Sequence, residues 1–172
     1  MIRKWLGSLA GSAAIGAILF AATAPADARE VVAFRDNVAA GTIVIKTSER
    51  RLYYVVGAGR AIRYPVGVGK PGKQWSGQTS IDGKYLHPDW APPSEVKHDI
   101  PRIPNLIRGG APNNPMGVAA MTLSGGQYAI HGTNRPGSVG GFVSYGCIRM
   151  FNQDISDLYD RVSVGTPVLV TR

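Results

Sequence analysis

One cysteine and one histidine stand close enough along this chain to act as a pair. Cys147 is the only cysteine in the sequence, and a short glycine-rich stretch separates it from His131. A thiol that attacks an amide needs a base to take its proton, and an imidazole is suited to that task near neutral pH. Gly146 has no Cβ, so the chain can turn tightly there and aim the backbone N–H groups of residues 145–147 at a developing oxyanion. The spacing therefore predicts nucleophilic acyl transfer, with Cys147 as nucleophile and His131 as base.

The charge beside the thiol bears on its reactivity. Arg149 follows Cys147 closely, and a helix is expected to begin near Asn152. Positive potential from both stabilises a thiolate, so we expect Cys147 to be accessible and partly ionised near neutral pH. Other interpretations stay open: Cys147 as a small buried hydrophobe or in an intermolecular disulfide, His131 as a hydrogen-bonding group at a strand end, and Arg149 as a solvated surface charge.

The first 28 residues have the composition of a secretory signal peptide. Arg3 and Lys4 supply positive charge, an apolar run follows over 6–22, and Ala-Asp-Ala at 26–28 offers small residues at the cleavage positions. An uncleaved membrane anchor is the alternative, although a run of this length is at the lower limit for spanning a bilayer. We expect cleavage after Ala28, export to the periplasm or cell envelope, and no stable membrane span after processing. In an oxidising compartment, a cysteine without a partner in its own chain points to a reactive thiol.

Length and composition indicate one globular domain rich in strands. The 172 residues are 44% apolar and 17% charged, and the 22 glycines and 12 prolines favour strands joined by turns. A net charge of +8 favours contact with anionic surfaces. No nucleic-acid partner is expected, because the chain carries an export signal and lacks a clustered basic stripe. No metal is expected either, because His87, His98 and His131 lack ligand spacing such as H-E-x-x-H.

The elements that must position these residues are mainly β-strands. Short β-branched and aromatic runs predict strands, and polar or glycine-rich residues between them predict hairpins. Pro65 indicates an edge position for the third strand. The irregular segment 69–115, rich in proline and glycine, is typical of a functional loop. Asn152 is expected to cap a helix that Gly165 ends. The expected strands are 42–46, 52–56, 61–68, 118–123, 127–131 and 167–171.

Two blocks of the chain fit a known pattern. The first is His-Gly-Thr at 131–133, and the second is Ser-Tyr-Gly-Cys-Ile-Arg at 144–149. Asn-Pro-Met-Gly at 114–117 and a Trp/Pro-rich segment at 87–93 accompany them. With these motifs, the sequence from about Gly41 to the end resembles the L,D-transpeptidase catalytic domain, also called the YkuD domain.

The resemblance implies a fold and a division of the chain. The fold is mainly β: an L,D-transpeptidase (YkuD-like) β-sandwich, with one short helix after the catalytic cysteine and a long active-site loop. Residues 1–28 would be the signal peptide, 29–40 an N-terminal lead-in, and 41–172 the catalytic domain.

The resemblance also implies a peptidoglycan L,D-transpeptidase without cofactor. Cys147 would attack the third residue of a tetrapeptide stem, release D-Ala and form a thioester, with His131 as the base. An acceptor amine from another stem, or from an envelope lipoprotein, would resolve the thioester. The other residues implied for the site are Gly132, Tyr145 and Gly146 through their backbone, and Ser144 and Arg149 as substrate contacts.

Two alternatives use the same sequence features. An L,D-carboxypeptidase would use the same residues with water as the acceptor. A non-catalytic wall-binding module would explain export and basic charge, but not the lone thiol after Ser-Tyr-Gly. The chain departs from the family pattern at Tyr145, where many members carry a second histidine, and at 77–83, which replaces a T-P-x-G segment.

Overall fold

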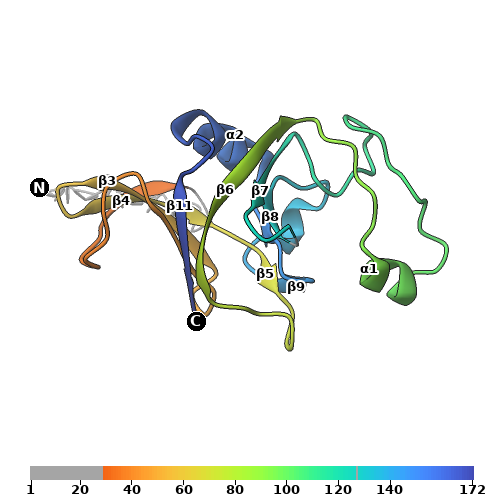
Figure 1. Ribbon diagram of the computed structural model, residues 1–172, viewed down its shortest axis with the longest axis horizontal. Helices are drawn as coiled ribbons and strands as arrows, with labels where there is room; N and C mark the ends of the chain where they lie inside the picture. Colours follow the sequence, from red (N-terminus) through yellow and green to blue (C-terminus); the bar gives the residue numbers. More distant parts are fainter. Residues whose placement is uncertain (1–28, 127) are drawn as a thin grey trace, which may run out of the picture.

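Strands dominate the chain in the computed structural model (Figure 1). It describes residues 29–126 and 128–172, so the predicted signal peptide at 1–28 lies outside the described residues. None of the helices within that part combines the length and the hydropathy that a bilayer crossing requires. The strands are β1 (Glu30–Ala33), β2 (Ile43–Lys46), β3 (Arg51–Gly57), β4 (Arg60–Pro65), β5 (Val68–Gly69), β6 (Gly77–Leu86), β7 (Ala119–Leu123), β8 (Ala129–His131), β9 (Phe142–Ser144), β10 (Ile148–Arg149) and β11 (Pro167–Thr171); the helices are α1 (Ser94–Asp99), the 3-10 turn η1 (Pro136–Ser138) and α2 (Asn152–Arg161).

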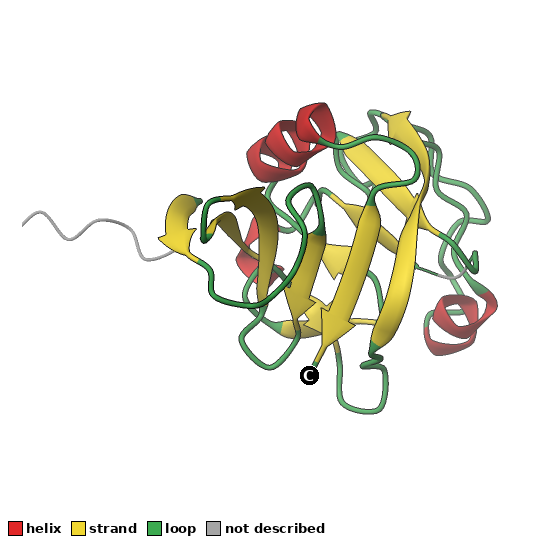
Figure 2. Cartoon of the chain, turned by 60° about the vertical axis from the view of Figure 1, so that its left-hand side comes forward, coloured by secondary structure: helices red, strands yellow, loops and turns green. Residues whose placement is uncertain are grey.

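A nine-stranded sheet forms the body, in the order β1-β4-β3-β2-β11-β6-β7-β8-β10. β2 and β3 form the first predicted hairpin, and β7 and β8 form the second. The closing strand β11 pairs parallel with β2 and antiparallel with β6. β6 pairs with β11 through its first residues and with β7 through its last ones (Figures 1 and 2). It thus joins the first half of the sheet, β1 to β4 with β11, to the second half, β7, β8 and β10.

One hydrophobic core lies between the two halves. Ile43 and Leu52 from the first half share a cluster with Met121 and Ile130 from the second, and Leu158 of α2 closes it. All five side chains are fully buried, and burial of each such side chain stabilises the fold by about 1.5–3 kcal/mol. The mainly β fold expected from the sequence is confirmed.

Several strands differ from the expected ones. The short strands β1, β9 and β10 were not expected, and neither was β6. The segment 69–115 contains β6, a ten-residue strand. Only Ile81 and Gly83 are buried along it, so the strand shows none of the apolar alternation by which strands are recognised. β4 is not an edge strand, because β1 pairs with it from Glu30 opposite Arg63 onward. Pro65 lies past the end of that pairing, where its missing N–H costs no ladder bond.

Asn152 does not cap α2 but is its first residue, and Phe151 occupies the cap position. The Asn152 Oδ1 instead accepts hydrogen bonds from the N–H groups of Thr133 at 2.9 Å and Val118 at 3.4 Å. The amide thereby joins the helix to the chain after β8 and to the residue before β7. Gly117 is needed beside it, because a Cβ there would overlap the Asn152 Oδ1 and the Thr133 N atom.

The other end of α2 is held by a lysine. The helix ends at Arg161, several residues before Gly165. The Lys84 ammonium, from β6, donates to the carbonyls of Tyr159 and Val162, each at 2.6 Å. These bonds satisfy carbonyls that the last turn of a helix leaves without partners, and the positive charge suits the negative end of the helix dipole.

Asp154 carries a buried carboxylate with an incomplete set of partners. The residue is 2% exposed, and its Oδ2 has no hydrogen-bond partner among the described residues. Burial, together with the nearby Asp157 carboxylate, raises the pKa of Asp154 from 3.8 to about 6. The native state therefore favours the protonated acid, and its contribution to stability is lost as the pH rises through about 6.

We expect Asp154→Asn to increase the free energy of unfolding at pH 7.5 by about 1–3 kcal/mol, since one pKa unit corresponds to about 1.4 kcal/mol. The gain should vanish near pH 3.5, where wild type carries a neutral acid as well. Urea unfolding at the two pH values measures it. Asp160→Asn, at an exposed position on the same helix, is the control and should change little. A destabilised Asp154→Asn protein at pH 7.5 would contradict the prediction.

Candidate active site

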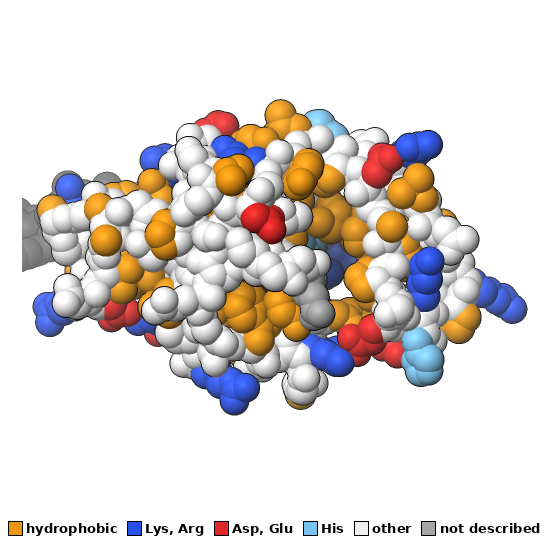
Figure 3. Space-filling view, in the orientation of Figure 1, with side chains coloured by type: hydrophobic (Ala, Val, Ile, Leu, Met, Phe, Trp, Pro, Cys, Tyr) orange, Lys and Arg blue, Asp and Glu red, His pale blue; other side chains and the backbone are white. Residues whose placement is uncertain are grey.

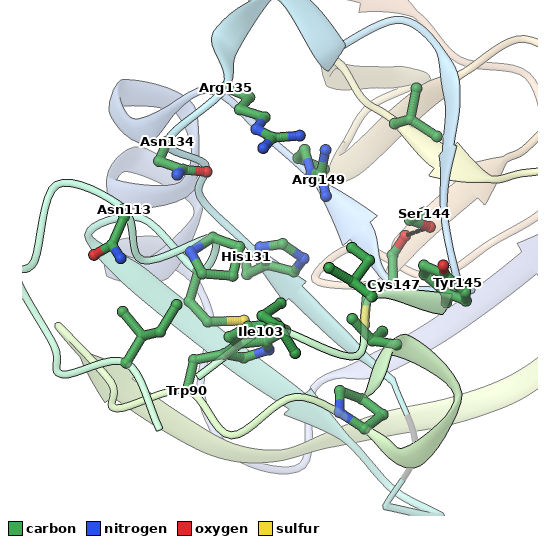
Figure 4. A pocket seen from close by; sticks show the side chains of 17 residues that line it. Trp90, Ile103, Asn113, His131, Asn134, Arg135, Ser144, Tyr145, Cys147 and Arg149 are labelled. Carbon is green, nitrogen blue, oxygen red and sulfur yellow. Dashed lines mark hydrogen bonds between the residues drawn. The ribbon is translucent and has the colours of Figure 1, made fainter. Parts of the chain in front are cut away.

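Two adjacent parallel strands bring His131 and Cys147 together. β10 pairs with β8 so that Ile148 lies opposite Ile130 and Arg149 opposite His131. Both isoleucines are buried in the core. Because side chains alternate along a strand, the residues flanking the isoleucines point to the other face. Cys147, Arg149 and His131 therefore share one pocket, as the lining residues show (Figure 4).

A short turn of the backbone presents the cysteine. The Ser144 hydroxyl donates to the carbonyl of Cys147 at 2.6 Å and accepts the N–H of Gly146 at 3.1 Å. Ser144 is 5% exposed and closes the turn from inside. It also lines the pocket, and its contact with substrate stays a prediction. The N–H of Gly146 is used within the turn, contrary to the expectation that it points at the oxyanion. The hydrogen bonds among the described residues leave the N–H groups of Tyr145 and Cys147 free.

Two aromatic rings brace this turn from behind. The Trp75 indole donates to the carbonyl of Gly146 at 2.9 Å, and its ring stacks on Tyr128 with 5.0 Å between centroids. Gly146 has φ +125°, and a Cβ there would overlap the Tyr128 ring. Glycine is therefore required both by the backbone angle and by the close approach of the ring.

His131 is a buried, neutral imidazole at the end of β8. It is 4% exposed, and its Nδ1 lies 2.7 Å from the carbonyl oxygen of Gly132. A carbonyl only accepts, so Nδ1 carries the proton and the other ring nitrogen is left to accept one. Burial and the positive charge of Arg149 lower the pKa of His131 to about 4, against smaller opposing effects of the backbone at Gly132 and Pro115.

The thiol of Cys147 is half-buried and favours its neutral form. Burial raises its pKa, while the backbone of Ala129 and the charge of Arg149 act in the opposite direction. The expectation of a partly ionised thiol near neutral pH is therefore wrong for this structure. Arg149 acts with the expected sign, but burial outweighs it.

Two guanidinium groups lie together at one side of the pocket (Figure 4). Arg149 donates to the Ser138 hydroxyl at 3.0 Å, while its Nε is buried without a partner among the described residues. No carboxylate there forms an ion pair with Arg149 or with Arg135. Burial and the charge of Arg135 lower the pKa of Arg149. A partly buried positive charge without a counter-charge is costly, so this corner of the pocket favours an anion.

A loop of the chain roofs the pocket. The pocket has a volume of about 370 Å³, and Figure 3 shows it as a hollow between the body and the lobe that carries α1. We call residues 87–117 the lid. The floor is polar, with the thiol, the imidazole and the two guanidinium groups, whereas the roof is apolar. The apolar lid residues that line the pocket include Trp90, Pro93, Val96, Ile100, Ile103 and Ile107.

The base of the lid is pinned by one buried amide. Asn114 is 2% exposed, and its side chain donates to the carbonyls of Pro88 at 2.9 Å and Arg108 at 3.0 Å. Its Oδ1 accepts the N–H of Met116 at 2.9 Å. Trp90 and Ile107 also pair through their backbones across the lid. The lid therefore leaves and rejoins the body at one fixed point.

The sequence identified part of this site. The structure brings Cys147, His131, Gly132, Arg149 and the Trp/Pro-rich segment into one pocket. Arg135 was missed, because an isolated arginine in a glycine-rich stretch carries no pattern. Trp75 and Tyr128 were missed because their contacts with Gly146 join segments far apart in the chain.

Known proteins share these features. The family model of the L,D-transpeptidase catalytic domain, YkuD, matches residues 40–170. The probable L,D-transpeptidase YbiS of Escherichia coli K12 is 39% identical over 135 residues, which cover 73% of this chain and 43% of that protein. The probable L,D-transpeptidase ErfK/SrfK of Salmonella typhimurium is 37% identical over 137 residues, or 74% of this chain and 43% of that protein. The chain thus spans less than half the length of these curated relatives.

Solved structures share the fold. An L,D-transpeptidase from Mycobacterium smegmatis superposes with a TM-score of 0.60 at 22% identity, covering 76% of this chain and 58% of that one. A Brucella melitensis protein described as a probable carnitine operon oxidoreductase superposes with a TM-score of 0.57 at 40% identity, covering 87% of this chain and 96% of that one. Because the family model spans most of the sequence and a curated relative is 39% identical over 73% of it, the chain belongs to the L,D-transpeptidase catalytic-domain family.

Proposed function

We propose that this protein is a peptidoglycan L,D-transpeptidase that acts in the cell envelope after export and removal of residues 1–28. The observation that carries the proposal is the register of β8 and β10, which puts a thiol and a neutral imidazole in one pocket. The family relatives are named L,D-transpeptidases, and their substrate class fits a pocket with a cationic corner. The acyl donor is a tetrapeptide stem, and the acceptor is an amine of a second stem.

The first half of the reaction forms a thioester. The free ring nitrogen of His131 takes the proton of Cys147 as the sulfur attacks the carbonyl of the third stem residue. The N–H groups of Tyr145 and Cys147 receive the oxyanion, because the N–H of Gly146 is already bonded to Ser144. The tetrahedral intermediate collapses when the C–N bond breaks, and His131 returns the proton to the leaving amine of D-Ala.

The second half runs the same steps with a new amine. The acceptor amine enters the place that D-Ala has left and gives its proton to His131 as it attacks the thioester. The C–S bond then breaks, and the sulfur recovers its proton from His131. The carbonyl of Gly132 holds the imidazole in one tautomer through both halves, a task that a carboxylate performs in other nucleophile–histidine pairs.

Arg149 and Arg135 bind the carboxylate of the terminal D-Ala. Arg149 lies two residues beyond Cys147 in the sequence, and both side chains line the same pocket, so one donor can meet the thiol with its scissile carbonyl and the guanidinium with the carboxylate that follows. The carboxylate supplies the counter-charge that the two guanidinium groups lack. Its arrival also removes one of the two causes that lower the pKa of His131, so a bound donor makes the base stronger.

A different acyl acceptor would give the protein a different function. With water as the acceptor, the same residues would give an L,D-carboxypeptidase, and a lysine of an envelope lipoprotein would give wall anchoring of that protein. The apolar roof over the pocket favours an amine acceptor, because it limits the access of water to the thioester.

Removal of either catalytic group tests the proposal directly. Cys147→Ala should abolish the acyl adduct and the release of D-Ala, because the chain has no other thiol. His131→Ala should slow acylation by about 100- to 10,000-fold, the range of a positioned general base. The assay follows D-Ala release from a disaccharide-tetrapeptide, with and without an acceptor amine, and the adduct by intact mass. Wild-type rates in Cys147→Ala would overturn the mechanism.

The pH dependence of alkylation and of D-Ala release follows from the protonation states of Cys147 and His131. Because burial raises the pKa of the thiol, the rate of Cys147 alkylation by iodoacetamide should keep rising above pH 8.5, the region where free thiols titrate. Arg149→Gln should shift the profile further upward, since Arg149 lowers that pKa. By contrast, D-Ala release should fall only below about pH 5, as His131 becomes protonated. An alkylation rate that is constant between pH 6 and 8 would indicate a resting thiolate and contradict this assignment.

A donor without its terminal charge tests the arginine pair. A tetrapeptide that ends in an amide should acylate Cys147 at least about tenfold more slowly than the free acid, since a charge-assisted hydrogen bond contributes about 1.5–3 kcal/mol. In Arg149→Gln and Arg135→Gln the preference for the free acid should shrink toward unity. Arg60→Gln, at an exposed position on β4, is the matched control and should keep it. An undiminished preference in both pocket variants would mean that another group binds the carboxylate.

A further inference from the structure

The tip of the lid is the part that carries α1. It contacts the rest of the protein through charged side chains close to the nucleophile. Asp99, at the end of α1, accepts a hydrogen bond from the Tyr145 hydroxyl at 2.5 Å and lies 3.3 Å from the Lys70 ammonium. The same ammonium stands 3.8 Å above the Tyr145 ring. Glu95, one turn earlier on α1, pairs with Lys73 at 2.5 Å. Figure 3 shows basic and acidic side chains meeting below the hollow.

The body side of these contacts is attached to the nucleophile turn. β5 pairs with β9, and the N–H of Lys70 donates to the carbonyl of Ser144 at 2.8 Å. Tyr145 is the next residue and lies between Ser144 and the Gly146-Cys147 step of the turn. Gly69 permits the tight turn that presents both lysines, because a Cβ there would overlap the Lys73 carbonyl. A force on Asp99 is therefore transmitted to the backbone that carries the thiol.

The two ends of the lid differ in the kind of contact that holds them. Buried bonds of Asn114 fix the base, whereas the tip rests on exposed groups, with Asp99 and Lys70 each more than a third exposed. An exposed ion pair shifts an equilibrium by only about two- to fivefold and is screened by salt. Such contacts break readily, so the tip is the end that lifts to admit a stem peptide beneath the apolar roof.

We propose that Tyr145 is a positioning residue that couples the nucleophile turn to the lid, and that Tyr145, Lys70 and Asp99 form a latch that opens for the acyl donor. When the latch is closed, the Tyr145 hydroxyl fixes the residue whose N–H faces the reacting carbonyl. When it is open, the donor can enter, and the turn loses one of its restraints. The consequence for catalysis rests on the proposed acyl transfer, whereas the latch itself does not.

Access to the thiol reports the latch independently of turnover. The readout is the rate of Cys147 labelling by a maleimide linked to a tripeptide, divided by the rate with iodoacetamide, which corrects for changes in thiol reactivity. In wild type this ratio should rise about three- to tenfold between 0.05 and 0.5 M NaCl, because salt weakens the ion pairs at the tip.

Two substitutions separate the parts of the latch. Asp99→Asn keeps an oxygen for Tyr145 but loses the attraction to Lys70, so the ratio should be higher than in wild type at low salt and should respond less to salt, since the Glu95–Lys73 pair alone remains. Tyr145→Phe removes the hydroxyl and keeps the ion pair, so the ratio should be raised and still respond to salt. The control is Tyr53→Phe, which removes an equivalent bond to Glu49 at 2.5 Å, beside Lys46 and away from the lid; it should match wild type.

Turnover then tests the positioning role. Asp99→Asn and Tyr145→Phe should each lower kcat about two- to tenfold, and the double variant should lose less than the product of the two single losses, because both contacts hold the same latch closed. Independent losses that multiply would overturn the positioning role, and an unchanged labelling ratio in Asp99→Asn would overturn the latch. If labelling changes as expected but wild type releases no D-Ala, the latch stands and the proposed acyl transfer is wrong.

Discussion

The parallel pairing of β8 with β10 is the constraint on which the site depends. Two isoleucines, Ile130 and Ile148, lie opposite each other and are buried in the core. A slip of one residue would send Cys147 inward and an isoleucine into the pocket, which would expose an apolar side chain and bury a reactive one. The hydrophobic core thereby fixes the register, and the register places the thiol beside the imidazole without a direct bond between them.

The charge of Arg149 acts on both members of this pair. In the resting protein the thiol favours its neutral form, and the charge of Arg149 helps to keep His131 neutral as well. A resting ion pair between thiolate and imidazolium is therefore disfavoured, which protects the cysteine from oxidation, since the thiolate is the reactive form. In the proposed reaction, a donor carboxylate on Arg149 would raise the pKa of His131 at the moment when a stronger base is needed. Burial thus outweighs the effect of Arg149 on the thiol and keeps it neutral, whereas the guanidinium charge keeps the imidazole neutral.

The sequence predicted the elements with strong local signals. Hairpins with β-branched strands, the amphipathic α2 and the motif around Cys147 all carry their information within a few residues. β6 could not be recognised, because it is mostly polar and is held by partners on both sides, β11 and β7. Asn152 looked like a helix cap, yet its side chain binds backbone groups that are remote in sequence. The ionisation of Cys147 was misjudged because nearby charge can be read from the sequence, whereas burial depends on the whole fold.

The site combines a rigid floor with a roof whose base is held by buried hydrogen bonds and whose tip is held by exposed ion pairs. The turn before Cys147 is fixed by Ser144 from within and by Trp75 and Tyr128 from behind. Acyl transfer requires such rigidity, because oxyanion donors act only when they are placed before the charge develops. In the proposed reaction the roof has to move, because a stem peptide must enter a pocket of about 370 Å³ beneath it. Buried bonds at the base of the lid and exposed ion pairs at its tip meet both needs, since only the tip can open at low cost. Tyr145 lies where these two requirements meet, one residue from the serine that closes the turn and in contact with Asp99 at the tip of the lid.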